Sequence, residues 1–394
     1  MDFMKLAARE RAYIEECRHY MHRHPERSHQ EEKTAAFIAG ELRSMGLDPQ
    51  ENVGGYGVTA VIKGRSGGRC VGLRADFDAL PVQEKTGCAF ASETDGLMHA
   101  CGHDCHAAML LGAAKVLVSI RDSFSGQVKL IFQPAEEDAA DSGAKRMIEA
   151  GCLKDPDVEI IYGQHVWPRV RKGCVGIRKG AVSAASDRFF IDIKGKASHA
   201  GAAPEKGIDA VVIAAETVNA LETIVSRNVS ALDAAVISIG LLQAGQRYNI
   251  VADNAHMEGT CRTFNPEVRR MIAERMRFIV EHTAAALGGE GTLDYRPGFS
   301  SVWNPEETVD TALPVLNELF AKENIIFEAD ADLSGEDFCF YGEHVPACYF
   351  HLGCREEGVM TAQLHQGSFL PSDGILVPGA ALLTALAVRY LEKP

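Results

Sequence analysis

The sequence lacks a long apolar run, because no stretch of the 394 residues approaches the roughly 20 consecutive apolar residues of a membrane-spanning helix. Residues 1–11 are charged and lack the apolar core of a signal peptide. The chain also has no low-complexity segment, no solenoid repeat and no long linker. We therefore expect a folded protein that does not interact with a membrane.

Positive charge is in the minority, with 40 Lys and Arg against 54 Asp and Glu, for a net charge of -14. This balance argues against nucleic acid and anionic membranes as partners. The eleven cysteines are odd in number and show no disulfide-framework spacing, which favours a reducing, cytoplasmic location. A hydrophobic content of 46% and the chain length favour about two domains in a soluble protein.

Periodicity predicts that the first part of the chain alternates helices with short buried strands. Helices are expected at 6–20, 31–45 and 107–119. Strands are expected at 58–63, 70–75, 127–132 and 160–165. The turn at 66–68 gives the first two strands a hairpin-like or strand-turn-strand signal.

A change of pattern near residue 182 predicts an inserted domain. From 188 to 295 the expected elements follow the order β-α-β-β-α-β, which is the ferredoxin-like pattern. The α/β pattern then resumes, with helices at 308–322 and 377–391 and strands at 325–327 and 347–352. We predict one α/β domain from 1–182 and 297–394, with an α+β domain, 183–296, inserted into it.

The stretch 98–106, Met-His-Ala-Cys-Gly-His-Asp-Cys-His, concentrates metal-binding side chains directly before an apolar helix. Gly102 lets the backbone bend so that Cys101 and His103 point into one site. A thiolate and an imidazole at a helix N-terminus suit half of a divalent metal site. Alone, the pattern is more typical of a buried structural cysteine beside surface histidines, so the interpretation depends on partners elsewhere.

Polar residues at the ends of three predicted strands supply such partners. Asp76 and Asp78 follow one strand, where Asp76 is a candidate to orient a metal-bound histidine. Glu136 and Glu137 follow another strand and point in different directions. One could therefore bind a metal while the other takes a proton from metal-bound water. His165 ends a third strand. Solvated turns and a structural histidine are the alternatives.

Four further residues are candidates. His199 lies in a Gly/Ala loop of the inserted domain, where little hinders access to a ligand. Asn249 and Arg262 are polar residues in otherwise apolar predicted strands, and the Arg262 guanidinium suits a carboxylate, although a surface salt bridge explains it equally well. His365 lies in a loop before the last helix.

The candidate ligands form a set of five, Cys101, His103, Glu137, His165 and His365. With Glu136 left free, and one ligand able to bridge, this set suits two metal ions about 3.5 Å apart. Mixed sulfur, nitrogen and oxygen donors favour Zn²⁺, with Mn²⁺, Co²⁺ or Ni²⁺ as alternatives.

These motifs, in this order, resemble the amidohydrolase branch of the di-metal aminoacylase/carboxypeptidase family. That branch includes hippurate hydrolase, the indole-acetyl-amino acid hydrolases and N-acetyl-diaminopimelate deacetylase. The resemblance extends from the His-Arg-His-Pro-Glu run at 22–26 almost to the C-terminus. It is carried by the runs 76–81, 99–104, 133–137, 165–168, 198–200, 336–338 and 364–365.

The resemblance implies a three-layer α/β/α catalytic domain, the five metal ligands above and Glu136 as general base. It implies that the inserted domain is a lid that forms a homodimer, and that His199 binds the reacting carbonyl, often across the dimer. It places Asn249 and Arg262 near the carboxylate end of the substrate. The chain departs from the family at Gln164 and at 366–367, which flank two of the ligands and bear on substrate choice.

The expected function is metal-dependent hydrolysis of the amide bond of a small N-acyl amino acid. Three rival functions remain open at this point. The first is a dipeptidase or carboxypeptidase on the same scaffold. The second is a metal-free thiol hydrolase that uses Cys101, and the third is a non-catalytic protein that binds a metal or ligand.

Overall fold

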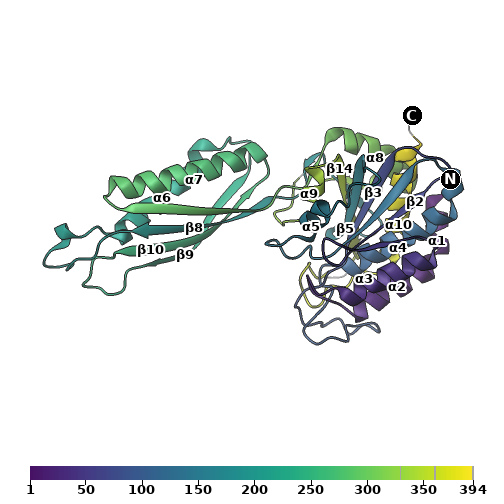
Figure 1. Cartoon of the computed structure of the whole chain (residues 1–394), viewed down its shortest axis with the longest axis horizontal. Coiled ribbons are helices and arrows are strands. Elements are labelled where there is room, and N and C mark those ends of the chain that lie inside the picture. The colour runs from purple at the N-terminus through teal and green to yellow at the C-terminus, as the bar shows by residue number, and fades with distance from the viewer. Residues whose placement is uncertain (329, 359–360, 393–394) are drawn as a thin grey trace. The chain divides into compact units, whose positions relative to one another are not determined.

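The computed structural model describes residues 1–328, 330–358 and 361–392, and within them the chain forms two compact units (Figure 1). The first unit comprises Met1–Val182, Val302–Asp330 and Asp337–Pro394, and the inserted unit comprises Ser183–Ser301 and Ala331–Glu336. The division after residue 182 coincides with the predicted boundary. The chain returns to the first unit at 302 rather than at 297.

The first unit is built on an eight-stranded mixed sheet with the order β1-β2-β4-β3-β5-β14-β6-β13. Strands β4, β3, β5 and β14 are parallel neighbours, so their carboxyl ends lie at one edge of the sheet. Strand β2 joins them antiparallel to β4. The strands are β1 (Gln50–Val53), β2 (Gly57–Lys63), β3 (Cys70–Asp76), β4 (Gln127–Gln133), β5 (Ile160–Arg171), β6 (Val175–Ile177), β13 (Ile325–Phe327) and β14 (Ala347–Arg355). A separate two-stranded pair consists of β7 (Gly180–Ala181) and β12 (Trp303–Asn304).

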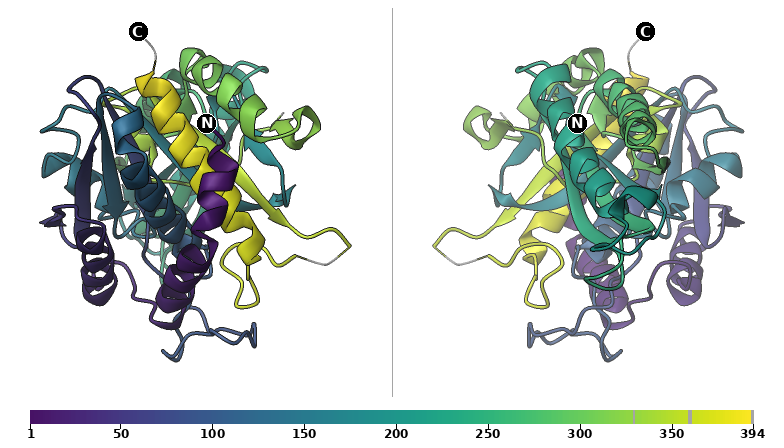
Figure 2. Two further views of the ribbon diagram at one scale, coloured as in Figure 1. Left: turned by 90° about the vertical axis from the view of Figure 1, so that its right-hand side faces the viewer. Right: turned by 90° about the vertical axis from the view of Figure 1, so that its left-hand side faces the viewer.

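Helices cover this sheet and complete a mixed α/β architecture, which confirms the predicted fold class. Helices α4 and α10 are apolar almost all round, pack against each other and lie on β3 and β5 (Figures 1 and 2). Helix α5 packs against β4 and α9. The helices are α1 (Phe3–Arg9), α2 (Arg11–Arg23), α3 (Glu32–Ser44), α4 (His103–Ser119), α5 (Gly143–Glu149), α8 (Glu306–Leu319), α9 (Cys339–Gly342) and α10 (Leu376–Leu391), with short 3-10 turns at Arg121–Ser123, Lys322–Asn324 and Asp373–Ile375.

The inserted unit has the predicted β-α-β-β-α-β order and its own apolar core. Its antiparallel sheet has the order β11-β8-β10-β9, so β9 is an edge strand, and α6 and α7 pack together on the sheet. The elements are β8 (Ala185–Lys194), α6 (Ala210–Asn228), β9 (Ala235–Ala244), β10 (Asn254–Thr263), α7 (Pro266–Ala286) and β11 (Glu290–Phe299), with a 3-10 turn at Pro204–Lys206.

Three expectations differ from the structure. The predicted helix 6–20 is two helices, α1 and α2, that meet at Glu10. Strands β2 and β3 do not form a hairpin, because β4 lies between them. The helical stretch 373–391 is also long and apolar enough to cross a membrane by length and composition, contrary to the expectation from the sequence. Its most apolar window is 83% buried inside the protein, which is typical of a core helix.

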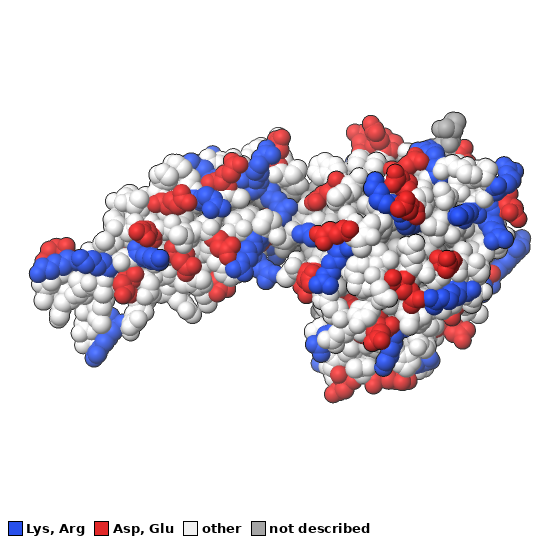
Figure 3. All heavy atoms as spheres, viewed as in Figure 1, with Lys and Arg blue, Asp and Glu red and all other residues white. Residues whose placement is uncertain are grey.

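Charged side chains of both signs are interspersed on the face shown in Figure 3.

Candidate metal centre

The five predicted metal ligands come together in the first unit, where β4 ends and α4 begins. His165 lies in the middle of β5, not at the end of its strand as expected. Their candidate donor atoms fall into overlapping groups within 4.8 Å of one another, namely Cys101, His103 and His165, then Cys101, Glu137 and His365, then His103, Glu136 and Glu137. The Cys101 sulfur lies 3.4 Å from His165 Nε2. Glu137 Oε1 lies 3.3 Å from His365 Nε2. Because Cys101, His103 and Glu137 belong to more than one group, the cluster is large enough for two ions.

Unusual backbone conformations bring these side chains together. Gly102 has φ of 91°, which a residue with a Cβ rarely adopts, and a Cβ there would lie 2.5 Å from Val166 Cγ2. Ala135 and His365 have φ of 52° and 67°. Such left-handed conformations cost about 1–3 kcal/mol each in residues other than glycine and are concentrated at functional sites.

Hydrogen bonds hold the two strained residues in place. The backbone N–H of His365 donates to Ala100 O at 2.8 Å. The backbone N–H of Ala135 donates to the buried Glu31 carboxylate at 2.8 Å. The fold therefore fixes the turn that precedes Glu136 and the loop that presents His365.

Asp78, rather than Asp76, orients the predicted ligand His103. His103 Nδ1 lies 3.1 Å from Asp78 Oδ1 and 2.9 Å from the Asp78 carbonyl oxygen. The same carboxylate accepts the backbone N–H of Glu137 at 3.0 Å. Asp76 Oδ2 is 4.0 Å from His103 Nε2, and Asp76 instead contacts Arg74 and His106, both at 2.6 Å. Asp76 was expected to orient a metal-bound histidine, and in the structure it contacts His106, which is outside the predicted ligand set.

His106 forms a further donor group with Asp76 and His103. Its Nδ1 contacts Asp76, and its Nε2 accepts the backbone N–H of Val166 at 3.0 Å, so a cation at Nε2 would have to displace a backbone hydrogen bond.

Cys101, His103 and His165 are buried, Glu137 is half-buried and His365 is exposed. Carboxylates surround the buried part of the cluster. Burial, together with the charges of Glu137 and Glu136, raises the pKa of the Cys101 thiol above its usual range. Burial lowers the pKa of the His103 imidazole, but Asp76 and Asp78 outweigh burial and raise it to about 10. Burial and the neighbouring His106 ring lower the pKa of His165. Carboxylates that favour a positive charge at His103 favour a bound cation in the same place.

The residues present fit a pair of divalent metal ions. His103 Nε2 is buried and has no hydrogen-bond partner in the described structure. Buried polar atoms are normally satisfied, so such an atom facing a cluster of donors indicates a missing partner. The donors are one sulfur, three imidazoles and a carboxylate, which is a borderline-soft set that suits zinc.

Glu136 has the position expected of a base beside these ligands. Its side chain is 7% exposed, and its Oε2 lies 4.0 Å from His103 Nε2. Its Oε1 accepts the backbone N–H of Asp337 at 3.4 Å. One carboxylate oxygen therefore faces the cluster while the other is anchored.

The three remaining predicted residues belong to the inserted unit. His199 is exposed, and its Nδ1 accepts the backbone N–H groups of Gly201 and Ala202 at 3.2 and 3.1 Å. Asn249 lies in the loop between β9 and β10, not in a strand as expected, and its buried Oδ1 has no partner in the described structure. Arg262 lies in β10 as expected and donates to Thr260 Oγ1 and, at 3.1 Å, to the Cys261 carbonyl oxygen.

Sequence reasoning missed the roles of Asp78 and Glu31. Asp78 is part of the Asp-Phe-Asp run that the sequence analysis singled out. However, the alternation of side chains along a strand does not predict which of the two acids contacts a histidine from another segment. Glu31 precedes α3 and bonds a residue far along the chain, so no local signal pointed to it.

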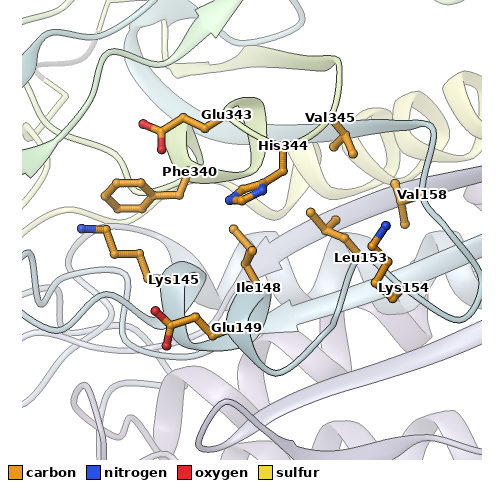
Figure 4. A pocket seen from close by; sticks show the side chains of 10 residues that line it. All are labelled: Lys145, Ile148, Glu149, Leu153, Lys154, Val158, Phe340, Glu343, His344 and Val345. Carbon is orange, nitrogen blue, oxygen red and sulfur yellow. The ribbon is translucent and has the colours of Figure 1, made fainter.

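A separate hollow of about 540 Å³ lies between α5 and α9 (Figure 4). Lys145 Nζ lies 4.2 Å from the Phe340 ring centroid at its side. The predicted ligands do not line this hollow.

Comparison with known proteins identifies the family. The model of "Peptidase family M20/M25/M40" matches residues 72–389. The chain belongs to this family. It is therefore a hydrolase of the M20 family, and the resemblance inferred from the motifs is confirmed.

The M20 chain is similar over nearly its whole length to proteins with different names. An N-acetylcysteine deacetylase of Bacillus subtilis is 39% identical over 376 residues, covering 94% of this chain and 95% of that protein. A hippurate hydrolase of Campylobacter jejuni is 36% identical over 379 residues, covering 96% and 97%. Thermostable carboxypeptidase 1 of Saccharolobus solfataricus is 37% identical over 386 residues, covering 97% and 96%.

A solved structure supports the same fold. The Bacillus subtilis YXEP protein, described as a dinuclear metal binding peptidase of the M20 family, aligns with a TM-score of 0.84 and 35% identity. The alignment covers 98% of this chain and 99% of that protein.

Proposed function

We propose that this M20 hydrolase cleaves the amide bond of N-acyl amino acids with two divalent metal ions held by Cys101, His103, Glu137, His165 and His365. The observation that carries this proposal is the convergence of those donors around the unpartnered His103 Nε2, with Glu136 beside them. Similarity to proteins named N-acetylcysteine deacetylase and hippurate hydrolase supports the substrate class.

The ions, when bound, supply a water of lowered pKa and polarise the scissile carbonyl. Glu136 takes a proton from the attacking water through its Oε2 and returns it to the leaving amine. The bond from Asp337 to Oε1 fixes the direction in which the other oxygen points. Glu136 is thus the residue on which turnover depends, whereas the ligands determine metal content.

His199 is proposed to stabilise the oxygen of the reacting carbonyl. Because its Nδ1 accepts two backbone N–H groups, the neutral ring carries its proton on Nε2 and is a donor there. A donor aimed at a developing oxyanion contributes about 3–4 kcal/mol. The unpartnered Asn249 Oδ1 and the Arg262 guanidinium are proposed to bind the polar and carboxylate end of the substrate.

The proposed assembly is a homodimer formed through the inserted unit. Strand β9 is the edge of its sheet, and Val236 and Leu242 on β9 are 43% and 47% exposed. An unpaired edge with exposed apolar side chains suits pairing with a second copy about a two-fold axis. We also propose a cytoplasmic location, supported by the eleven cysteines, which are all free.

Replacing Glu136 with Gln tests the proposal. We expect kcat for N-acetyl amino acids to fall by at least about 100-fold, because a general base contributes roughly 10²–10⁴-fold, with metal content unchanged. Glu149→Gln on the surface is the matched control. Near-normal turnover by Glu136→Gln refutes the assignment.

A carboxypeptidase or dipeptidase activity is the second candidate, favoured by the similarity to a thermostable carboxypeptidase. A panel of N-acetyl, N-benzoyl and longer N-acyl amino acids, assayed beside dipeptides and longer peptides, separates the two. Higher kcat/KM on peptides than on every N-acyl amino acid favours the second candidate.

A further inference from the structure

A second group of metal-binding side chains lies apart from the predicted ligand set. His22 is on α2, and Glu84 and Cys88 are in the segment that connects β3 to α4. His22 Nε2 lies 3.4 Å from Glu84 Oε1, and the Cys88 sulfur lies 3.8 Å from the same oxygen. The three donor atoms lie within 4.8 Å of one another. None of them has a role in the reaction proposed above.

Local structure presents Glu84 and Cys88 on the same side. Gly87 has φ of 67°, which turns the chain back between them. The other carboxylate oxygen of Glu84 accepts the backbone N–H of Ser92 at 2.6 Å, and the N–H of Cys88 donates to Thr86 Oγ1 at 3.3 Å. The segment therefore holds the carboxylate and the thiol in place without a bound ion.

A carboxylate holds the His22 ring in place, as is common for histidine ligands in metal sites. Its Nδ1 contacts Asp104 Oδ2 at 2.9 Å, and Asp104 also accepts from Arg18 at 3.1 Å. A carboxylate on one ring nitrogen fixes the ring orientation and directs the other nitrogen to the metal. Asp78 has the same relation to His103 in the predicted di-metal centre. His22 Nε2 therefore points at Glu84 with a fixed geometry.

We propose that His22, Glu84 and Cys88 bind a further divalent cation of the zinc class. Tetrahedral zinc with bonds of about 2.0–2.3 Å places its donors about 3.3–3.8 Å apart. The separations of 3.4 and 3.8 Å match these edges. One nitrogen, one oxygen and one sulfur suit a borderline-soft cation, and partial exposure of Cys88 leaves a fourth position for water.

Binding would replace the proton between His22 and Glu84 and the thiol proton of Cys88, both of which pass to solvent. The ion would then link α2 to the segment that leads into Cys101 and His103. Its expected effect is to stabilise that segment rather than to take part in hydrolysis.

Thiol labelling tests the proposal by comparing the chelator-treated protein with the same protein after Zn²⁺ has been added. Cys88 is the one cysteine of the eleven that is not buried, so a brief treatment with iodoacetamide should modify it selectively. We expect added Zn²⁺ to slow this modification at least tenfold, as measured by intact mass and peptide mapping. Glu84→Gln and His22→Gln should each remove the protection. His19→Gln is the matched control, because His19 is on the same helix but outside the donor group.

Metal content supplies the second measurement. After equilibration with Zn²⁺ and removal of free ion, the wild type should hold one equivalent of zinc more than Cys88→Ser. The two proteins should hydrolyse substrate at the same rate. Equal metal content in the two proteins, or equal Cys88 labelling with and without Zn²⁺, overturns the proposal. Loss of activity in Cys88→Ser also overturns it, because the ion would then belong to the catalytic centre.

Discussion

Asp78→Asn is the most informative change to the predicted metal centre, because one carboxylate orients both a ligand ring and a ligand backbone. Asp78 contacts His103 Nδ1 at 3.1 Å, accepts the backbone N–H of Glu137 at 3.0 Å and accepts Ser28 Oγ–H at 2.7 Å. Burial opposes the charge on Asp78, but the contact with His103 outweighs it and lowers the pKa of the carboxyl. The group is therefore an anion throughout the working range of pH.

The expected loss follows from those contacts. Asparagine keeps the size of the side chain but removes its charge, and a hydrogen bond to a charged group contributes about 1.5–3 kcal/mol. At 1.4 kcal/mol per factor of ten, this predicts roughly 10–100-fold weaker binding of at least one metal ion, in the range known for residues that support ligands. At limiting metal, kcat/KM should fall with occupancy, and excess metal should restore most of it.

Competition with a chromophoric chelator measures the metal dissociation constants, and kcat/KM is measured over a metal titration. Ser28→Ala is the graded control, because it removes one neutral hydrogen bond to the same carboxylate and should cost less than about tenfold. Wild-type affinity in Asp78→Asn would refute the reasoning, since the carboxylate would then not support His103.

Three further predictions concern the strained turn, the buried acid and the sheet edge. Gly102→Ala should destabilise the protein by about 1–3 kcal/mol in denaturant unfolding and lower metal content, because its Cβ meets Val166, whereas Gly46→Ala, also at positive φ but in open space, should keep its metal. Burial and the charge of Asp78 raise the pKa of Glu31 to about 8 from 4.5. The folded state thus binds the extra proton, so stability from this group is full below pH 4.5 and is lost as pH rises toward 8. The free energy of unfolding of the chelator-treated protein, measured against pH, should show this decline, and the decline should be smaller in Glu31→Gln. Parallel curves for the two proteins would count against this prediction. Leu242→Lys on β9 should shift the proposed homodimer toward monomer in sedimentation experiments, while Leu287→Lys elsewhere in the inserted unit should not.

The sequence predicts elements better than it predicts contacts. Helix α4 and strands β3 and β4 follow from apolar periodicity and strand-end polar residues, and the insertion follows from a change of pattern. Strand β5 was predicted at the right place, but it continues past His165 to Arg171. The strand order β2-β4-β3 cannot be predicted in this way, because pairing between distant strands has no local signature in the sequence. The five candidate ligands could be named from the sequence because they belong to motifs in a fixed order. The contact of Asp78, rather than Asp76, with His103 could not be predicted, because it depends on how α4 approaches the end of β3.

The order in which the ribosome makes this chain bears on how it folds. Helix α10 packs between α4, α1 and α8, yet it is translated long after α4. Until α10 emerges, the apolar face of α4 that packs against it stays uncovered, and general chaperones bind exposed apolar surface of this kind. The inserted unit closes its core almost entirely from consecutive residues, so it is free to fold while synthesis of the rest continues.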